Sequence, residues 1–484
     1  MSDLKTLFDS IFTASASLAT APILALGVGL LLLLLCDIVT PLRPARGLAF
    51  VGTLVVAAIL QARVLFANSA PGLVLDGTFL ADPTTALFGL SFLVGSLLAW
   101  LYASGYYDEE RVLATEHDVL FLAAPAGMIL MVGAADLLVF FVGLELLSLP
   151  LYALAAFRRS RADSVEAGLK YFLLGAFSSA MFLFGSALLY TAAGSLSLSA
   201  IAEHGLASRT ALAGIALVTS GVFFKASIFP FHMWVPDVYQ GSPTPVTALM
   251  ATGTKAAIFG FLVVQLMPLL PPSAAPMIAV LAIVTMFLGN FGALVQSNVK
   301  RMLAYSGVAH AGTLLLVVPG FLAGADPAAA SRAALFYLVA YLFTGTGAFG
   351  LLALLEADGE RFTSLDSLKG LAKRRPAIAA AMTLFLLSLG GIPATGGFLG
   401  KWFVFSVLVE AGWTGTAILG VLFSVVALGY YLRVIVAMYM EEALEGEAAP
   451  TTNRTGATAA TAVCVVGVLA TGLLPALLLG PLGS

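Results

Sequence analysis

Apolar segments of about 20 residues follow one another along almost the whole chain, with short polar connections between them. A segment of that length spans a bilayer as one helix, and backbone that faces lipid must be helical or part of a closed barrel. Of the 484 residues, 60% are hydrophobic and 10% are charged, which lies outside the composition of soluble domains. The sequence predicts an all-α polytopic membrane protein and leaves no room for a nucleic-acid-binding or soluble catalytic domain.

Hydropathy over windows of about 19 residues predicts fourteen membrane-spanning helices. The predicted ranges are 20–40, 47–66, 83–104, 119–133, 136–156, 167–193, 211–229, 244–266, 276–296, 302–323, 333–355, 377–410, 414–440 and 457–480. The range 377–410 is too long for one straight crossing. It contains the glycine-rich stretch LGGIPATGGFLGK, so we expect a broken helix there.

Basic residues gather in alternate connections, and this bias predicts the orientation of the chain. The connections after odd-numbered helices hold fourteen of them: Arg43, Arg46, Arg111, Arg158, Arg159, Arg161, Lys300, Arg301, Arg361, Lys369, Lys373, Arg374, Arg375 and Arg454. The connections on the other side hold four, which are Lys5, Arg63, Arg209 and Arg332. We therefore expect the first set in the cytoplasm and both termini outside. The start, MSDLKTLFDSIFTASAS, lacks the basic segment of a cleavable signal peptide.

Four ionisable residues fall deep inside predicted spans: Glu145, Lys225, Lys255 and Lys401. A charge at the centre of a membrane helix costs about 2.5 to 3.5 kcal/mol even on the translocon scale, so the fold must offset it by pairing or hydration. A buried lysine can release its proton, whereas an arginine stays protonated. A carboxylate that moves beside a lysine changes whether the lysine keeps its proton, so Glu145 and Lys225 would form a switch. The alternative is a buried ion pair that only fixes helix packing.

The remaining polar residues of the spans have simpler interpretations. Lys170 and Arg433 lie near predicted cytoplasmic helix ends, where long side chains can snorkel to the headgroups. Asp136 lies at a helix end, where we expect it to be solvated or to cap the helix. We expect His117 and His204 in loops.

Prolines interrupt two predicted spans beside the buried lysines. Pro230 follows Lys225 by five residues in GVFFKASIFPFHMWVP, and Pro393 with its neighbouring glycines lies just before Lys401. Unwound backbone survives in a bilayer only where protein or a watery cavity surrounds it. Two interrupted spans, five helices apart and each with a lysine at the break, are typical of an inverted-repeat transporter. The alternative is a pair of unrelated kinks that ease helix packing.

This pattern divides the chain into four parts. They are an N-terminal three-helix segment at 1–118, a first five-helix repeat at 119–266, a second five-helix repeat at 276–440, and an acidic loop with the C-terminal helix at 441–484. We assign no function to the acidic stretch 441–454.

Two histidines are further candidates for the proton path. His310 lies deep in a predicted span, in YSGVAHAGTLLL, where an imidazole can act as a relay. His232, in FHMWVPDVYQGSP, is either a second relay member or an interfacial histidine with satisfied hydrogen bonds.

Three stretches carry a resemblance to a known family. FPFHMWVPDVYQGSPTPVTALMATGTKAAIFG, at 229–260, resembles a long signature of the antiporter-like subunits of respiratory complex I and of multisubunit cation/proton antiporters. GLELLSLPLYALAAF at 143–157 and KYFLLGAFSSAMFLFGSALLYTAAGS at 170–195 are similar to the subunit N family of bacterial NADH:quinone oxidoreductase. The resemblance is strong from about 119 to 435 and weak in the first three helices and the last one.

The resemblance implies a role for each buried residue. Glu145 corresponds to the ion-pair glutamate of the family, Lys225 to its partner lysine, Lys255 to the central lysine and Lys401 to the exit-side lysine. His310 matches the region of a relay histidine less closely. The implied function is proton translocation coupled to electron transfer in other subunits of a bacterial inner-membrane complex, with both termini in the periplasm.

The resemblance also implies cofactors and partners. We expect this chain to bind no cofactor or metal, because it has no clustered cysteines and no nucleotide-binding loop, and Cys36 and Cys464 are interpreted as small buried side chains. NADH, FMN, iron–sulfur clusters and quinone are expected in other subunits. The expected partners are other membrane subunits, the lipid bilayer and protons, without nucleic acid.

Two alternative functions stay open at this stage. One is a subunit of a multisubunit sodium/proton antiporter, which shares the lysine signature, although the stretches at 143–195 favour subunit N. The other is a scaffold subunit of the membrane arm, in which the lysines would affect assembly and not pumping.

Overall fold

The computed structural model describes residues 14–66, 72–104, 106, 114–356, 363–442 and 455–480. Within this part of the chain, thirteen helices are long and apolar enough to cross a membrane. Two further helices, α18 (Pro376–Gly390) and α19 (Gly396–Glu410), together form the broken helix that the sequence predicts at 377–410. The fourteen predicted spans are thus confirmed. The start of the chain up to residue 13, where no cleavable signal peptide is expected, and residues 443 to 454 of the acidic loop lie outside the described residues.

The N-terminal part contains three spans and a small hairpin. Its elements are α2 (Ala14–Ile38), η1 (Thr40–Ala45), α3 (Arg46–Leu65), β1 (Gly72–Val74), β2 (Phe79–Ala81) and α4 (Pro83–Ala103). The two strands pair antiparallel, with Leu73 opposite Leu80. Asp82 caps α4 by accepting a hydrogen bond from the backbone N–H of Thr85, which fixes where this helix begins.

The next part runs from α5 to η5. Its elements are α5 (Ala114–Gly133), α6 (Leu137–Ala155), α7 (Ala162–Ala193), α8 (Leu198–His204), α9 (Arg209–Ala226), α10 (Trp234–Gly241), α11 (Thr244–Leu249), η3 (Met250–Thr254), α12 (Lys255–Phe261), η4 (Leu262–Leu266) and η5 (Met267–Leu269). Helix α9 ends four residues before Pro230, because the proline ring excludes the helical conformation of the preceding turn. Helix α10 resumes at Trp234, so this span is interrupted as predicted.

The last part runs from η6 to α22. Its elements are η6 (Pro272–Ala274), α13 (Ala275–Leu294), α14 (Val299–Leu315), α15 (Val317–Leu322), α16 (Pro327–Leu355), η8 (Asp366–Leu368), α17 (Leu371–Arg374), α18, α19, α20 (Thr414–Met440), α21 (Thr455–Leu473) and α22 (Ala476–Leu479). The break between α18 and α19 contains Pro393 and begins at Gly391, whose φ of 86° is a conformation that glycine adopts without strain. The grouping of the helices into two inverted repeats stays a prediction.

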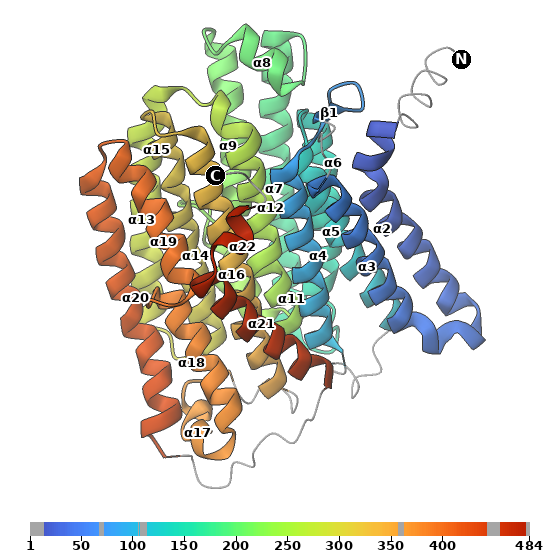
Figure 1. Ribbon diagram of the computed structural model, residues 1–484, viewed down its shortest axis with the longest axis vertical. Coiled ribbons are helices and arrows are strands. Elements are labelled where there is room, and N and C mark those ends of the chain that lie inside the picture. Colours follow the sequence, from blue (N-terminus) through green and yellow to red (C-terminus); the bar gives the residue numbers. More distant parts are fainter. Residues whose placement is uncertain are drawn as a thin grey trace.

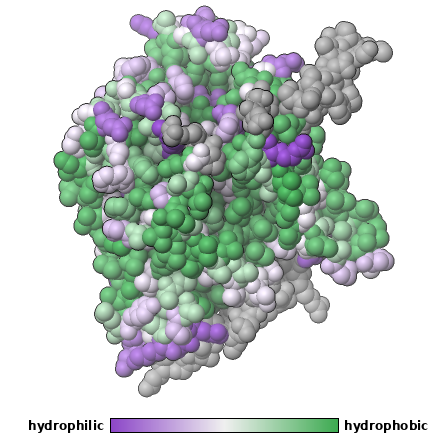
Figure 2. All heavy atoms as spheres, in the orientation of Figure 1, coloured by the Kyte–Doolittle hydropathy of each residue, from purple (hydrophilic) through white to green (hydrophobic). Residues whose placement is uncertain are grey.

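Three spans form the interior of the bundle. The residues of Thr244–Leu269, Val299–Leu322 and Pro327–Leu355 are almost all buried, whereas fewer than a third of those of Leu18–Ile38 and Thr414–Met440 are buried. Figure 1 shows α2 and α3 at one edge of the bundle, α20 at the other, and α21 lying obliquely across the front. Figure 2 shows hydrophobic side chains over the middle of this face and hydrophilic ones toward both ends, as expected for a protein that spans a bilayer.

Several polar residues near helix ends are held inside the protein. His117 was predicted in a loop, and this is wrong: it is buried in α5, next to Asp118, which pairs with Arg46 and accepts from the Trp100 indole. These partners satisfy the polar groups within the bundle. Asp136 caps α6, which is one of the two roles predicted for it. His204 is exposed and lies at the end of α8.

Two basic residues predicted to snorkel find protein partners instead. Lys170 donates to Asp237 and pairs with Glu166, at 2.8 and 2.7 Å. Arg433 donates to the carbonyl oxygens of Leu294 and Gln296, at the end of α13. A cation at that position satisfies carbonyls that have no partner within the helix.

Helices α5 and α6 approach each other through glycine. A Cβ atom added at Gly127 would lie 2.5 Å from the backbone nitrogen of Leu147 and 2.6 Å from the carbonyl oxygen of Gly143. Backbone atoms cannot move aside as a flexible side chain can. Small residues thus permit the close packing that associates helices in lipid.

We expect Gly127→Ala to destabilise the bundle by about 1–3 kcal/mol, because the added methyl group overpacks a backbone contact. Thermal unfolding of the purified protein in detergent measures the change. Gly52→Ala is the matched control, since a Cβ at Gly52 meets no atom within 4 Å. Equal unfolding temperatures for the two variants would show that α5 and α6 can separate without cost.

Candidate functional site

Three lysine side chains are buried inside the bundle at or next to irregular helical segments. Lys225, Lys255 and Lys401 are 1%, 3% and 7% exposed. Lys225 lies in the last turn of α9 before the break, Lys255 follows the π-helical turn η3, and Lys401 lies one turn after α19 begins. Broken and π-helical turns free backbone groups that a regular helix would use internally.

Lys225 is held by aromatic groups. Its Nζ donates to the hydroxyl of Tyr152 on α6 at 2.9 Å. The same nitrogen lies 4.7 Å from the ring centroids of Tyr152 and Tyr171, within the range of cation–π attraction. The ammonium is therefore stabilised without a carboxylate in direct contact.

Glu145 is near this group but bonds to another helix. It accepts a hydrogen bond from the Ser179 hydroxyl of α7 at 2.5 Å, and within the described residues it makes no ion pair with Lys225. Glu145 and Tyr152 are seven residues apart on α6, which places them on the same face of that helix. Tyr152 thus lies between the predicted switch partners.

Aromatic rings connect Lys225 with Lys255. The ring of Tyr171 stacks on Trp234 at 4.7 Å, and Trp234 packs edge-on against Tyr239 at 6.0 Å. The Nζ of Lys255 lies 5.5 Å from the centroid of the Tyr239 ring. Both Trp234 and Tyr239 belong to α10, so the short helix after the break contacts the surroundings of both lysines.

Lys255 is the least satisfied of the three. Its Nζ is buried and has no hydrogen-bond partner among the described residues. A Cβ at Gly307 would lie 3.3 Å from this nitrogen and 3.2 Å from the Tyr341 hydroxyl, so the ammonium and the hydroxyl meet over a glycine of α14. A buried charge in this position requires a mobile partner or the loss of its proton.

His310 lies in a network of tyrosines on the far side of Lys255. Its Nδ1 and Nε2 lie 2.6 and 3.2 Å from the hydroxyls of Tyr337 and Tyr431. Tyr431 also bonds to Ser306 at 2.5 Å, and the ring of Tyr341 lies 5.0 Å from that of His310. Both ring nitrogens therefore have hydroxyl partners that can either donate or accept.

Lys401 caps the broken helix. Its Nζ donates to the carbonyl oxygens of Leu389 and Gly390, both at 2.9 Å, at the end of α18. These carbonyls lack partners within the helix, and a cation there also interacts favourably with the helix dipole. A Cβ at Gly391 would lie 3.2 Å from Nζ, so a glycine is needed both for the turn and for the approach of the lysine.

Two small cavities meet at His310. One, of about 10 Å³, is lined by His310, Lys401, Asn290 and Thr313, among others. The other, also of about 10 Å³, is lined by His310, Tyr337 and Tyr341, among others. Each has room for about one water molecule, and His310 lies between the surroundings of Lys401 and the tyrosines.

His232 is separate from these groups. It lies in the segment between α9 and α10, half-buried, and its Nδ1 has no hydrogen-bond partner among the described residues. Its ring packs 6.0 Å from that of Phe229. Within the described residues, His232 thus lies beside the break between α9 and α10 and is not part of the row that contains Lys225, Lys255 and Lys401.

The sequence missed several polar residues of the interior. Glu356 and Lys300 are 0% and 1% exposed, although the positions suggested a helix end and a loop. The tyrosines around the lysines gave no signal, because tyrosine in an apolar helix is unremarkable. Among the described residues, no group of three or more His, Cys, Asp or Glu is placed to hold a metal ion.

A protein-family model matches residues 134–427 of this chain. The family is described as "NADH:quinone oxidoreductase/Mrp antiporter, TM". The matched range includes Glu145, Lys225, Lys255 and Lys401.

Individual proteins agree with this match. The chain is 41% identical over 444 residues to NADH-quinone oxidoreductase subunit N 2 of Roseiflexus castenholzii, covering 88% of this chain and 87% of that protein. A chain in the structure of respiratory complex I from Thermus thermophilus with bound aureothin matches with a TM-score of 0.79 and 34% identity, covering 95% of this chain and 98% of that one. A chain of the Mrp complex from Dietzia matches with a TM-score of 0.81 and 24% identity over 96% of each chain, a likeness of fold alone.

We expect Gly175→Ala to displace the partner of Lys225. A Cβ at Gly175 of α7 would lie 2.0 Å from the Tyr152 hydroxyl oxygen, so the phenol must leave its place, at about 1–3 kcal/mol of stability. A double-mutant cycle on thermal unfolding with Tyr152→Ala checks the cause, because the two costs should not add. Gly415→Ala is the control, as it meets no atom within 4 Å. Strictly additive costs would contradict the assigned contact.

Proposed function

Because the chain belongs to the NADH:quinone oxidoreductase/Mrp antiporter family, we propose that it is a subunit N of NADH:quinone oxidoreductase that carries protons across the membrane. The relatives at about 40% identity over most of the chain support the membrane-arm subunit, and the buried lysines support the proton path. Protons are the cargo, since a row of lysines, tyrosines and a histidine offers exchangeable protons and no ligand set for a metal ion.

The observation that carries the proton path is a row of polar and aromatic groups through the interior. From Lys225 the row continues through Tyr171, Trp234 and Tyr239 to Lys255, and then through Tyr341 and His310 to the cavity at Lys401. Placing a charge in a membrane interior is costly, so a scaffold would have no physical reason to keep three lysines there without carboxylate partners.

The first step concerns Glu145 and Lys225. When Glu145 is bonded to Ser179, Lys225 depends on Tyr152 and two aromatic rings. If Glu145 turns toward Tyr152, its negative charge favours the protonated form of Lys225; when it turns away, the proton is released more readily. Electron transfer in other subunits would drive this change through the neighbouring membrane subunits.

The later steps move a proton from Lys255 to Lys401. Lys255 has no hydrogen-bond partner among the described residues. A change in the charge of Lys225 therefore alters the proton affinity of Lys255 across the intervening rings. The proton then passes through the hydroxyl–imidazole network of Tyr337, His310 and Tyr431 to the cavity that Lys401 lines. Lys401, held by backbone carbonyls, is the exit-side group.

The cofactors of the reaction belong to other subunits. NADH, FMN, iron–sulfur clusters and quinone are placed there, and this chain contributes no redox centre. Its partners are the other membrane subunits of the complex, which would cover part of its apolar surface. The four-part division of the chain and the inverted relation of 119–266 to 276–440 belong to the same proposal.

The two alternatives are less well supported. The likeness to the Mrp complex is one of fold, whereas the relatives named subunit N share about 40% of the sequence. A scaffold would be expected to pair or replace its buried charges, and the orphan Nζ of Lys255 argues against it.

We expect Lys255→Ala to reduce proton uptake per NADH oxidised, because the central proton carrier is lost. We expect Lys225→Ala to lower both NADH oxidation and proton uptake, because the switch that couples them is lost. NADH-driven uptake into sealed inverted vesicles at matched complex content measures both. Lys373→Ala is the control, since Lys373 is an exposed lysine of α17. Normal uptake in both variants, with the complex assembled, would refute the proton path and favour the scaffold.

The proposed location is a bacterial inner membrane with both termini in the periplasm. We expect a cysteine at Lys373→Cys to react with a membrane-impermeant maleimide in inverted vesicles only, and one at Arg209→Cys in intact cells only. Both positions are exposed, while the native Cys36 and Cys464 are buried and give little background. The opposite labelling pattern would reverse the orientation.

A further inference from the structure

Glu356 is a buried carboxyl that the proposed path does not use. It follows the last residue of α16, a helix of the bundle interior, and its side chain is 0% exposed. A carboxylate at the C-terminal end of a helix is disfavoured by the helix dipole, and burial adds to the cost because Glu356 forms no ion pair with another described residue. Its presence there therefore needs a reason beyond packing.

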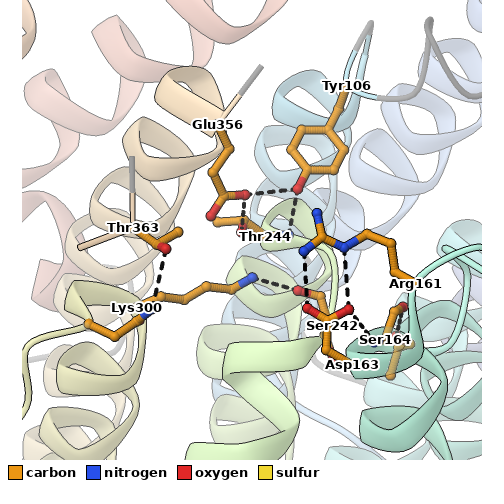
Figure 3. Close-up of polar contacts among 11 residues, drawn as sticks. Tyr106, Arg161, Asp163, Ser164, Ser242, Thr244, Lys300, Glu356 and Thr363 are labelled. Carbon is orange, nitrogen blue, oxygen red and sulfur yellow. Dashed lines mark hydrogen bonds and ion pairs between the residues drawn. The ribbon is translucent and has the colours of Figure 1, made fainter. Parts of the chain in front are cut away.

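The hydrogen bonds of Glu356 leave one oxygen free for a proton. Oε2 accepts from the hydroxyl of Tyr106 at 2.8 Å and from that of Thr244 at 2.5 Å. Oε1 is buried and has no hydrogen-bond partner among the described residues. Figure 3 shows the carboxyl group between these two hydroxyls. The arrangement suits both protonation states, because Oε2 keeps its two donors while Oε1 gains or loses a proton.

Charged groups surround the same place. Lys300 Nζ donates to the carbonyl oxygen of Ser242 at 2.6 Å, two residues before Thr244 (Figure 3). The guanidinium of Arg158 lies 4.6 Å from the centroid of the Tyr106 ring. These two cations thus contact a hydrogen-bond donor of Glu356 and the backbone beside the other donor.

A polar cavity lies close to this group. It has a volume of about 260 Å³ and is lined by Lys300 together with Asp163, Glu166, Lys170, Asp237 and Arg301, among others. Lys300 thus contributes to the cavity wall and also reaches the segment that leads to Thr244. The cavity lies at the end of the bundle that carries the excess of basic residues, which is the side predicted to be cytoplasmic.

Glu356 also contacts the first residue of the span that carries Lys255. Thr244 is the first residue of that span, and its backbone N–H points to the Tyr106 hydroxyl at 3.4 Å. Eleven residues separate it from Lys255, a rise of about 17 Å along the helix. Between them, the hydroxyls of Thr252 and Thr346 lie 3.2 Å apart, so α16 and this span share a polar contact on the way.

We propose that the Glu356 carboxyl is the proton-binding site at which protons from the charged cavity are loaded before they reach Lys255. A proton from water binds Oε1 and gives the neutral acid. That O–H bond then breaks as the proton moves inward along water and hydroxyl groups, and it ends on a neutral Lys255 amine as the ammonium. Glu356 returns to the carboxylate, held by Tyr106 and Thr244. This inference rests on the proposed function and adds to it the uptake group.

The test compares Glu356→Gln with the parent in the assembled complex. The amide keeps the volume of the side chain and can accept from both hydroxyls, but it cannot bind a proton. We expect proton uptake per NADH oxidised in inverted vesicles to fall to the level of Lys255→Ala. Glu203→Gln, which removes an exposed carboxylate on α8, should pump like the parent.

A second readout reports the proton itself. Infrared difference spectra of the complex during NADH oxidation should contain a band of a protonated carboxyl that Glu356→Gln removes and Glu203→Gln retains. If Glu356→Gln assembles poorly, Glu356→Asp keeps the carboxyl on a shorter chain, and its band should be shifted from that of the parent. A spectrum identical in the parent and the Glu356 variants would overturn the proposal.

The possible outcomes distinguish failure of the Glu356 proposal from failure of the proposed function. Normal uptake in Glu356→Gln with reduced uptake in Lys255→Ala overturns the role of Glu356 and leaves the lysine path intact. Normal uptake in both overturns both. Reduced uptake in both, together with loss of the carboxyl band, supports loading at Glu356.

Discussion

The structure depends on how three ammonium groups are kept inside a membrane without carboxylates at hand. Tyrosine π faces and a hydroxyl surround Lys225, and backbone carbonyls hold Lys401. Lys255 has no hydrogen-bond partner among the described residues. The breaks in the helices follow from this need. An intact helix would use its own carbonyls, so the end of α18 becomes a cation site only because the chain turns at Gly391.

The contrast among the three lysines suggests a direction for the proton. Lys401 is fixed by two hydrogen bonds to main-chain oxygens of the broken helix. Lys225 rests on a tyrosine whose position depends on Gly175, and so on the packing of α7 against α6. A shift of that packing changes the support of one ammonium and leaves the other untouched, which is the asymmetry that directional transfer needs.

The sequence predicted the spans, the two breaks and the buried lysines, because hydropathy and proline act locally and are visible in a single chain. It could not predict that Ser179 holds Glu145, since that contact depends on the rotation of α7 about its axis. Lys300, Glu356 and His117 were missed for one reason. Hydropathy places a residue at a helix end but does not tell whether that end meets solvent or a neighbouring helix.

Glycine and hydroxyl residues determine how close these groups come. Gly307 lets the Lys255 ammonium and the Tyr341 hydroxyl share one space, and Gly391 does the same for Lys401 and the end of α18. Each of these glycines faces a group that can carry a proton. Small residues are common in membrane helices because they permit close packing. Here the same property brings groups with exchangeable protons close to one another, so the proposed proton path depends on the same kind of residue as helix packing.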